Sequence, residues 1–142
     1  MYYVAARPGV GKTAFGLGLL HNFTSDEPAF GPAQRCLLYT LEMSDLQIIQ
    51  RIVAARARVP LSSIRRPDRH HLSEDRVRRV RDAQGWVSSR PFDLVPRSVQ
   101  LSQLAGHARW LATRYRTTQR PLRCIIVDYV QLVGPDERGD SR

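Results

Sequence analysis

The sequence predicts an α/β fold in which helices flank a mainly parallel sheet. Three observations favour it: near-continuous apolar runs at 36–41 and 124–133, segments of helical apolar spacing between them, and a glycine-containing turn at 6–13. Strands that helices cover on both faces are apolar throughout, and strands that alternate with helices form parallel sheets. We expect one domain over 1–142, because 142 residues is a single-domain length.

The first part of the chain is predicted to form a strand, a helix and a loop. Residues 2–6 are an apolar strand, and residues 13–23 have helical spacing, with Gly16 and Gly18 permitting close packing of the helix. Residues 25–34 contain two prolines and a glycine, so we expect a loop there before the 36–41 strand.

Two helices with recognisable starts follow. Ser44 and Gln47 form a capping box for the first, which Pro60 ends, and Ser73 caps the second. The first carries an apolar face of Leu46, Ile49, Val53 and Ala57. The second carries Val77, Val80 and Gln84/Val87 on one side and arginines on the other.

The last part of the chain is predicted to hold a short strand at 92–95, a helix and a long strand. The helix follows from the 3/4 spacing of Leu101, Leu104, Ala108, Leu111 and Tyr115. The strand at 124–133 is the most strand-like run of the chain, and Gly134 and Pro135 end it.

The turn at 6–13 has the sequence of a phosphate-binding P-loop and the context that such a loop requires, between a strand and a helix. Its backbone amides and the positive end of the helix would hold the phosphates of a nucleotide. Lys12 would reach the β- and γ-phosphates, and the hydroxyl of Thr13 would bind Mg²⁺. The predicted cofactor-binding residues are Ala6, Arg7, Pro8, Gly9, Val10, Gly11, Lys12, Thr13 and Ala14.

Lys12 is the only lysine among the 22 basic residues of the chain. In so arginine-rich a chain, the surviving lysine indicates a position where a compact ammonium is needed and a guanidinium does not fit. It is therefore our first candidate for a residue that takes part in chemistry.

Two carboxylates follow predicted strands. Asp128 ends an apolar run in the Walker B manner and is expected to hold Mg²⁺, because the carboxyl ends of parallel strands line the ligand crevice. Glu42 ends the 36–41 strand at the same edge, so it is the candidate for the residue that activates the attacking water. From spacing alone, Glu42 is equally well explained as a charge that complements the next helix.

Three stretches together resemble the ATPase domain of DnaB-type replicative DNA helicases. They are residues 6–14 (ARPGVGKTA), 39–51 (YTLEMSDLQIIQR) and 125–132 (IIVDYVQL), and the resemblance runs in order through the whole chain. Ala6 departs from the general P-loop pattern, which has glycine there, but this family carries alanine or glycine at that position. Gln131 lies in the last stretch and is given no role.

The resemblance implies a RecA-like P-loop NTPase fold and a homo-hexameric ring that binds ATP and Mg²⁺ between subunits. Lys12 and Thr13 match the family's P-loop pair, Glu42 its catalytic base and Asp128 its Walker B acid. DNA, as single strand and fork, is the implied partner, together with primase and loader proteins. We expect a cytoplasmic protein without a membrane segment, since no apolar stretch approaches the ~18 residues of a membrane span.

The resemblance also predicts that the chain is a fragment, incomplete at its C-terminal side. The family's amino-terminal domain, DNA-contacting loops, sensor strand and arginine finger have no counterpart here. In RecA-like sheets, a further strand separates the P-loop strand from the Walker B strand. Without it, the 2–6 strand would face a gap, and we expect marginal stability and slow or absent ATP turnover.

Two other functions stay open from the sequence. One is a different RecA-like ATPase, such as a recombinase or a clock-type ring protein, and the other is a non-catalytic nucleotide-binding remnant. The stretches after Glu42 and around Asp128 favour the helicase over both.

Several further features favour plain explanations. The net charge of +9 is concentrated at 51–81, where a polyanion-binding patch is possible and a solvated helix face is favoured. We expect His70 and His71 to lie in a surface loop, and Trp86 and Trp110 to pack in a core or interface. Cys36 and Cys124 are far apart in the sequence, and we expect them to be buried strand thiols in a reducing compartment, not a disulfide or zinc framework.

Overall fold

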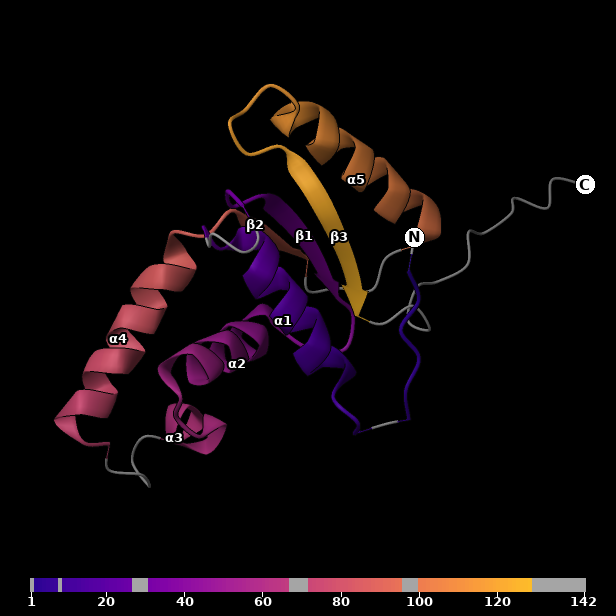
Figure 1. Ribbon diagram of the computed structural model, residues 1–142. Coiled ribbons are helices and arrows are strands. Elements are labelled where there is room, and N and C mark those ends of the chain that lie inside the picture. The colour runs from indigo at the N-terminus through magenta and orange to yellow at the C-terminus, as the bar shows by residue number, and fades with distance from the viewer. Residues whose placement is uncertain (1, 8, 27–30, 67–71, 96–99, 129–142) are drawn as a thin grey trace, which may run out of the picture. The chain divides into compact units, whose positions relative to one another are not determined.

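The computed structural model describes residues 2–7, 9–26, 31–66, 72–95 and 100–128, and it divides the chain into two compact units (Figure 1). The first unit consists of Met1–Glu42 and Pro91–Arg142, and the second of Met43–Arg90. Among the described helices, none is long and apolar enough to cross a membrane.

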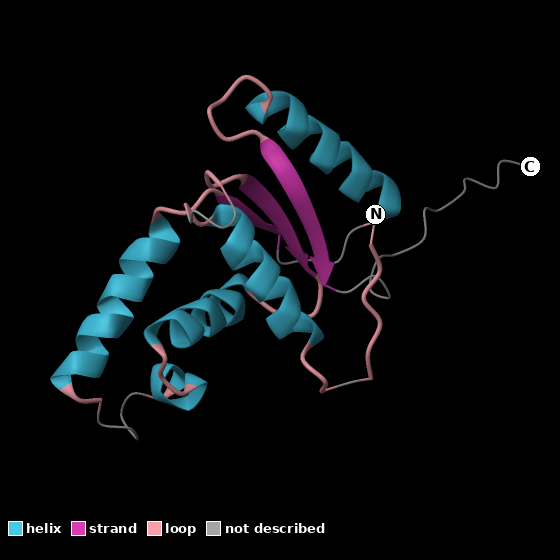
Figure 2. Ribbon diagram, in the orientation of Figure 1, coloured by secondary structure: helices cyan, strands magenta, loops and turns pink. Residues whose placement is uncertain are grey.

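A parallel sheet of three strands organises the first unit, in the order β2-β1-β3 (Figure 2). The strands are β1 (Arg35–Thr40), β2 (Phe92–Val95) and β3 (Leu122–Asp128). The predicted α/β class, the parallel pairing and the 92–95 strand are therefore confirmed. β1 is buried over nearly its whole length, as its apolar run predicts for a central strand that helices cover on both faces.

Helix α5 (Leu101–Tyr115) covers one face of this sheet. Leu37 and Tyr39 of β1 pack against Ala108 and Leu111 of α5 in a buried cluster. The hydroxyl of Tyr39 lies 3.2 Å from the carbonyl oxygen of Leu104 and 3.0 Å from Nδ1 of His107. The ring thus fills the core while its polar tip ties β1 to the helix above it.

Helix α1 (Lys12–Thr24) packs against β1 and β3 on the opposite face. Side chains alternate along a strand, so Ile126 of β3 points away from the α5 side. A Cβ placed on Gly16 would lie 3.6 Å from Cγ2 of Ile126, which is an ordinary contact. A Cβ on Gly18 would meet nothing within 4 Å, so the expected close packing at Gly18 is wrong.

Residues 2–6 do not form the expected strand. They have no regular secondary structure, and Tyr2, Tyr3 and Val4 are 98%, 76% and 56% exposed. An isolated strand leaves its backbone amides and carbonyls without partners, and no strand within the described ranges lies next to this segment to supply them. Apolar composition alone therefore does not make this segment a strand.

The second unit consists of helices α2 (Asp45–Ala57), α3 (Leu61–Arg65) and α4 (Glu74–Ser88). The predicted capping box is confirmed at α2, where the Ser44 hydroxyl accepts from the amide of Gln47 and Oε1 of Gln47 accepts from the amide of Ser44. The Ser73 cap of α4 is also confirmed.

The buried faces of these helices differ from the expected ones. In α2 the buried residues are Ile48, Ile52, Val53, Ala54 and Ala57, whereas Leu46 in the first turn is 63% exposed. In α4 only Ala83 and Val87 are buried, on the side that packs against α2. The first half of α4 is an exposed, arginine-rich surface. α2 also ends at Ala57, before Pro60, and Pro60 precedes the unexpected short helix α3.

Candidate nucleotide-binding site

The two predicted acidic residues are brought to one edge of the sheet by β1 and β3. Thr40, the last residue of β1, pairs in register with Asp128, the last residue of β3. The next amide along, that of Leu41, donates to the carbonyl oxygen of Asp128 at 2.9 Å. Glu42 follows directly and is exposed, while Asp128 is half-buried. Both carboxylates therefore stand at the carboxyl edge, where parallel α/β sheets bind ligands.

The glycine-containing turn ends at the start of α1, as the P-loop sequence predicts. Gly9 and Gly11 have φ angles of 80° and 101°, in the region that favours glycine over every other residue. Gly11 is the N-cap of α1, so no side chain accepts from the amides of the first turn. This turn contains no acidic residue, so the positive end of the helix dipole is not neutralised from within α1.

The ammonium group of Lys12 lies within the curve of this loop. Its Nζ donates to the carbonyl oxygen of Ala6 at 2.8 Å and to that of Arg7 at 3.4 Å. The amide of Val10 donates to the same Arg7 carbonyl at 3.4 Å, closing a turn. Thr13 and Ala14 continue the first turn of α1, and Pro8, the remaining predicted loop residue, lies outside the described residues.

The start of α1 lies beside the end of β3 (Figure 1). Gly16 faces Ile126, since a Cβ added to Gly16 would lie 3.6 Å from Cγ2 of Ile126. Ile126 is two positions before Asp128, and Thr13 precedes Gly16 by about one helical turn. The fold thus brings the loop, Lys12 and Thr13 to the same end of the sheet as Asp128 and Glu42. Their roles in binding and catalysis stay a prediction.

The donors at this edge fit a magnesium nucleotide better than a metal ion alone. Among the described residues, no group of three or more His, Cys, Asp or Glu side chains could hold a metal ion. Mg²⁺ at nucleotide sites needs fewer protein ligands, since phosphates and waters supply most of its ligands and the protein adds one or two oxygens. A threonine hydroxyl and an aspartate oxygen beside a free helix N-terminus are such a set.

The sequence did not predict two features of the first unit. One is Thr40, which is 1% exposed and lies beside Asp128. A polar residue at the end of an apolar strand could have indicated this position. The other is the position of Cys36 and Cys124, which are direct register partners on β1 and β3. The sequence predicts only that each is a strand thiol. No local spacing could have indicated this pairing, because it depends on which strands become neighbours.

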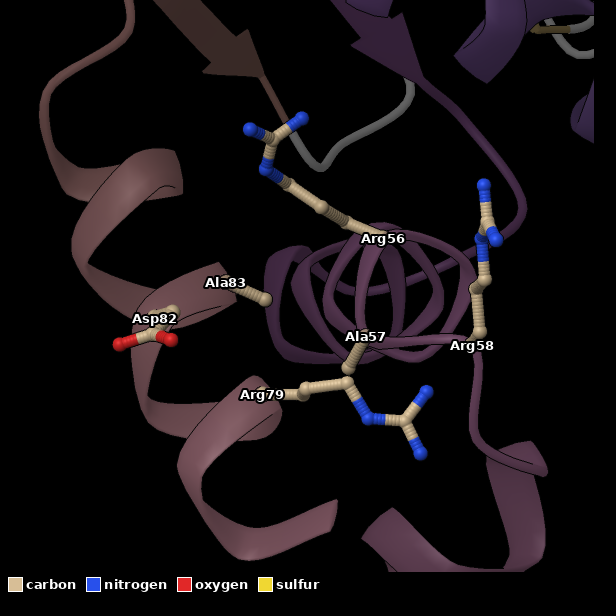
Figure 3. Close-up of a pocket in the computed structure, with 6 residues that line it drawn as sticks. All are labelled: Arg56, Ala57, Arg58, Arg79, Asp82 and Ala83. Atoms are coloured by element: carbon tan, nitrogen blue, oxygen red, sulfur yellow. The ribbon is translucent and has the colours of Figure 1, made fainter. Parts of the chain in front are cut away.

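The arginine-rich second unit contains a cavity of about 440 Å³, but the residues that line it do not form an anion site. Its walls come from Arg56, Ala57, Arg58, Arg79, Asp82 and Ala83. Figure 3 shows the three guanidinium groups well separated from one another. Arg56 stacks on Trp86 at 4.1 Å, and Arg78 and Arg79 pair with Asp75, as on the solvated helix face that the sequence favoured.

The remaining sequence expectations have mixed outcomes. Trp110 is 54% exposed and stacks on His107, so its assignment to a core is wrong, while Trp86 is half-buried beneath Arg56. His70, His71 and Gln131 lie outside the described residues.

The fold and this edge define a class of protein: a P-loop nucleotide-binding domain of the RecA-like kind. The whole chain, residues 1–142, matches the family model for the DnaB-like helicase C terminal domain, and the chain belongs to this family. Replicative DNA helicase DnaB of Synechocystis sp. (strain ATCC 27184 / PCC 6803 / Kazusa) is 30% identical over 138 residues, 95% of this chain and 15% of that protein. Its counterpart in Haemophilus influenzae is 30% identical over 141 residues, 98% of this chain and 28% of that protein.

Solved structures agree in fold. A solved ATPase domain superimposes with a TM-score of 0.77 at 24% identity, covering 95% of this chain and 44% of that one. A second solved structure, described as a DnaB-like replicative helicase and its interactions with primase, also superimposes with a TM-score of 0.77. Its identity is 24%, and the match covers 95% of this chain and 31% of the other. The chain spans less than a third of the length of the two DnaB relatives named above.

Proposed function

We propose that this chain binds and hydrolyses ATP with Mg²⁺ and is the motor segment of a replicative DNA helicase. One observation carries the proposal: the P-loop at the start of α1, Asp128 and the residues that lead to Glu42 meet at one edge of a parallel sheet. Membership of the DnaB-like family supports DNA as the partner and strand separation as the work done.

Lys12 and the loop amides hold the phosphates in this proposal. The ammonium group exchanges its bonds to the carbonyls of Ala6 and Arg7 for phosphate oxygens, and the amides of the first turn of α1 donate to the same group. Left-handed glycines at 9 and 11 let the backbone approach without a Cβ between.

Thr13 and Asp128 hold Mg²⁺, which when bound neutralises charge that develops on the phosphates. Glu42 orients a water and accepts its proton. It can do so because it is exposed at the same edge, two residues beyond the Thr40 that pairs with Asp128. The peptide group between Thr40 and Leu41, directly before Glu42, is held by the bond from its N–H to the carbonyl oxygen of Asp128, so the base and the metal ligand share one backbone support.

By the family relationship, the working assembly is a homo-hexameric ring on DNA, with primase and loader proteins as further partners. Replication takes place in the bacterial cytoplasm, so a cytoplasmic location follows from the proposed activity. Only the family relationship supports these partners and this assembly.

Three variants test the proposal in the protein that carries this chain, by ATP turnover and by unwinding of a forked duplex. Lys12→Ala should lower ATP affinity by about tenfold or more, because it removes hydrogen bonds to a charged group. Glu42→Gln should keep ATP affinity and lower turnover by about 100-fold or more, as expected for loss of a general base. Arg78→Ala makes the same change of charge as Lys12→Ala on an exposed surface of α4 and should leave both unchanged.

The outcomes separate the alternatives. If turnover and unwinding survive Lys12→Ala, the motor assignment is wrong. If ATP binds and is hydrolysed but a forked duplex is never unwound, a recombinase or clock-type ATPase replaces the helicase. If ATP binds but neither the wild type nor Glu42→Gln hydrolyses it, the chain is a nucleotide-binding module without catalysis.

A further inference from the structure

The two cysteines of the chain are neighbours in the sheet, although neither has a role in the proposed ATP site. Cys36 on β1 and Cys124 on β3 are register partners, and both are free thiols. Register partners on adjacent parallel strands point to the same face. That face carries α1, because Ile126, two positions after Cys124, faces Gly16 of α1, where an added Cβ would lie 3.6 Å from Cγ2 of Ile126.

An irregularity in β3 creates this pairing. Arg35 pairs with Leu122 but Cys36 pairs with Cys124, so Arg123 is an extra residue between the two pairs. A regular ladder would set Arg123 opposite Cys36 instead. The bulge therefore decides that thiol meets thiol, and it also bends and twists β3 locally.

The spacing suits a disulfide bond. Adjacent strands lie about 4.8 Å apart, within the roughly 4.4–6.8 Å between Cα atoms that disulfides span. The two thiols are close enough to affect each other's ionisation, since Cys36 lowers the pKa of Cys124 and Cys124 raises the pKa of Cys36. Forming the bond then needs only small movements of the strands.

We propose that Cys36 and Cys124 are a redox pair whose reversible disulfide locks strand β3 to strand β1. Within the described part of the sheet, β1 is the only strand that β3 pairs with, so the lock acts on the attachment that positions Asp128. The proposal does not depend on ATP hydrolysis by the chain.

The two thiols are suited to different steps. Cys124 is the more exposed of the two, whereas Cys36 is fully buried. Interaction with Cys36 lowers the pKa of Cys124, and interaction with Cys124 together with burial raises the pKa of Cys36. Cys124 is therefore the thiol that reacts first with an oxidant from solution, and Cys36 is the resolving thiol.

Glutathione disulfide is a sufficient oxidant. The Cys124 thiolate attacks one of its sulfurs, which breaks the S–S bond and releases one glutathione thiolate. The sulfur of Cys36 then attacks the Cys124 sulfur of the mixed disulfide, passes its proton to the departing glutathione and releases it. Two electrons leave the two cysteines and reduce one glutathione disulfide to two glutathione molecules.

The test exposes the folded protein to glutathione disulfide, alkylates the remaining thiols and maps the peptides by mass spectrometry. We expect a link between the peptides that contain Cys36 and Cys124, and its loss in dithiothreitol. The oxidised form should melt roughly 10 °C higher, because the bond closes a long loop. Amide exchange at 122–128 should also slow.

Two single variants serve as matched controls. Cys36→Ser should retain one glutathione on Cys124, because the resolving thiol is gone, and Cys124→Ser should stay unmodified, because Cys36 is buried. Three results would overturn the proposal: wild type that stops at the glutathione adduct of Cys124, thiols that stay reduced until the protein unfolds, and a link that forms only between two chains.

Discussion

The backbone amide of Leu41 donates to the carbonyl oxygen of Asp128 across the carboxyl edge of the sheet, at 2.9 Å. This bond extends the pairing of β1 and β3 one residue beyond Thr40 and Asp128. It fixes the start of the segment that carries Glu42 to the end of the strand that carries the proposed magnesium ligand. A change in either strand should therefore affect both carboxylates.

The Asp128 side chain should matter for the metal and not for the nucleotide alone. Asp128→Asn is expected to lower the affinity for ATP by about tenfold in the presence of Mg²⁺, because a charged oxygen ligand is lost. In EDTA the variant should bind ATP like wild type. Titration calorimetry measures both, with Asp82→Asn on α4 as the control that removes the same charge elsewhere. Equal losses with and without Mg²⁺ would contradict the assignment.

Two glycines of α1, one at its N-cap and one in its middle, should respond to alanine in opposite directions. Gly11 has a φ of 101°, so Gly11→Ala should lower the free energy of unfolding by at least ~1–2 kcal/mol. Gly18 is an ordinary helical residue with open space around it, so Gly18→Ala should raise the free energy of unfolding by ~0.5–1 kcal/mol. Urea unfolding measures both. Destabilisation by Gly18→Ala would mean that α1 packs more tightly than described.

Tyr39 should stabilise the first unit through its hydroxyl as well as its ring. Tyr39→Phe removes the contacts to Leu104 and His107 and should lower the free energy of unfolding by ~0.5–1.5 kcal/mol, because two half-buried partners lose a hydrogen bond. Urea unfolding of wild type and variant measures this cost. An unchanged free energy of unfolding in this variant would show that the hydroxyl contributes nothing.

The same residue predicts a dependence on alkaline pH. Burial raises the pKa of Tyr39 above its usual value of 10.0. Its hydroxyl thus ionises in the unfolded chain before it does in the folded one, and its stabilising contribution is complete below pH 10 and is lost as the pH rises through the folded pKa. The advantage of wild type over Tyr39→Phe in urea unfolding should shrink above about pH 10. An advantage that grows with pH would contradict the burial of this hydroxyl.

Local sequence signals predicted the parts of this chain that local physics determines. The P-loop residues, the capping box at Ser44 and the apolar strand that becomes β1 each follow from residues a few positions apart. They were sufficient to place Glu42 and Asp128 at one edge, because parallel strands share a carboxyl edge whatever their order. Lys12 comes to the same edge through the packing of α1 against β3, since the strand expected before it does not form.

Features that depend on strand neighbours could not be predicted in the same way. Residues 2–6 have the composition of a strand but no described partner, so they are not one. Cys36 meets Cys124 only because β1 and β3 are adjacent and Arg123 is skipped. Leu46 is apolar but exposed. The face of α2 that becomes buried depends on where α4 packs, and α4 is distant in the sequence.

The central claim is that one magnesium nucleotide site joins the P-loop, Glu42 and Asp128. Its most direct test replaces Mg²⁺ by paramagnetic Mn²⁺ in complex with ATP and follows the broadening of backbone amide signals by NMR, with MgATP as the diamagnetic control. We predict that Lys12, Thr13, Glu42 and Asp128 broaden first and together, ahead of Leu122 at the opposite end of β3. Broadening that is strongest at Leu122, or that spares Asp128 while it affects Thr13, would contradict the claim.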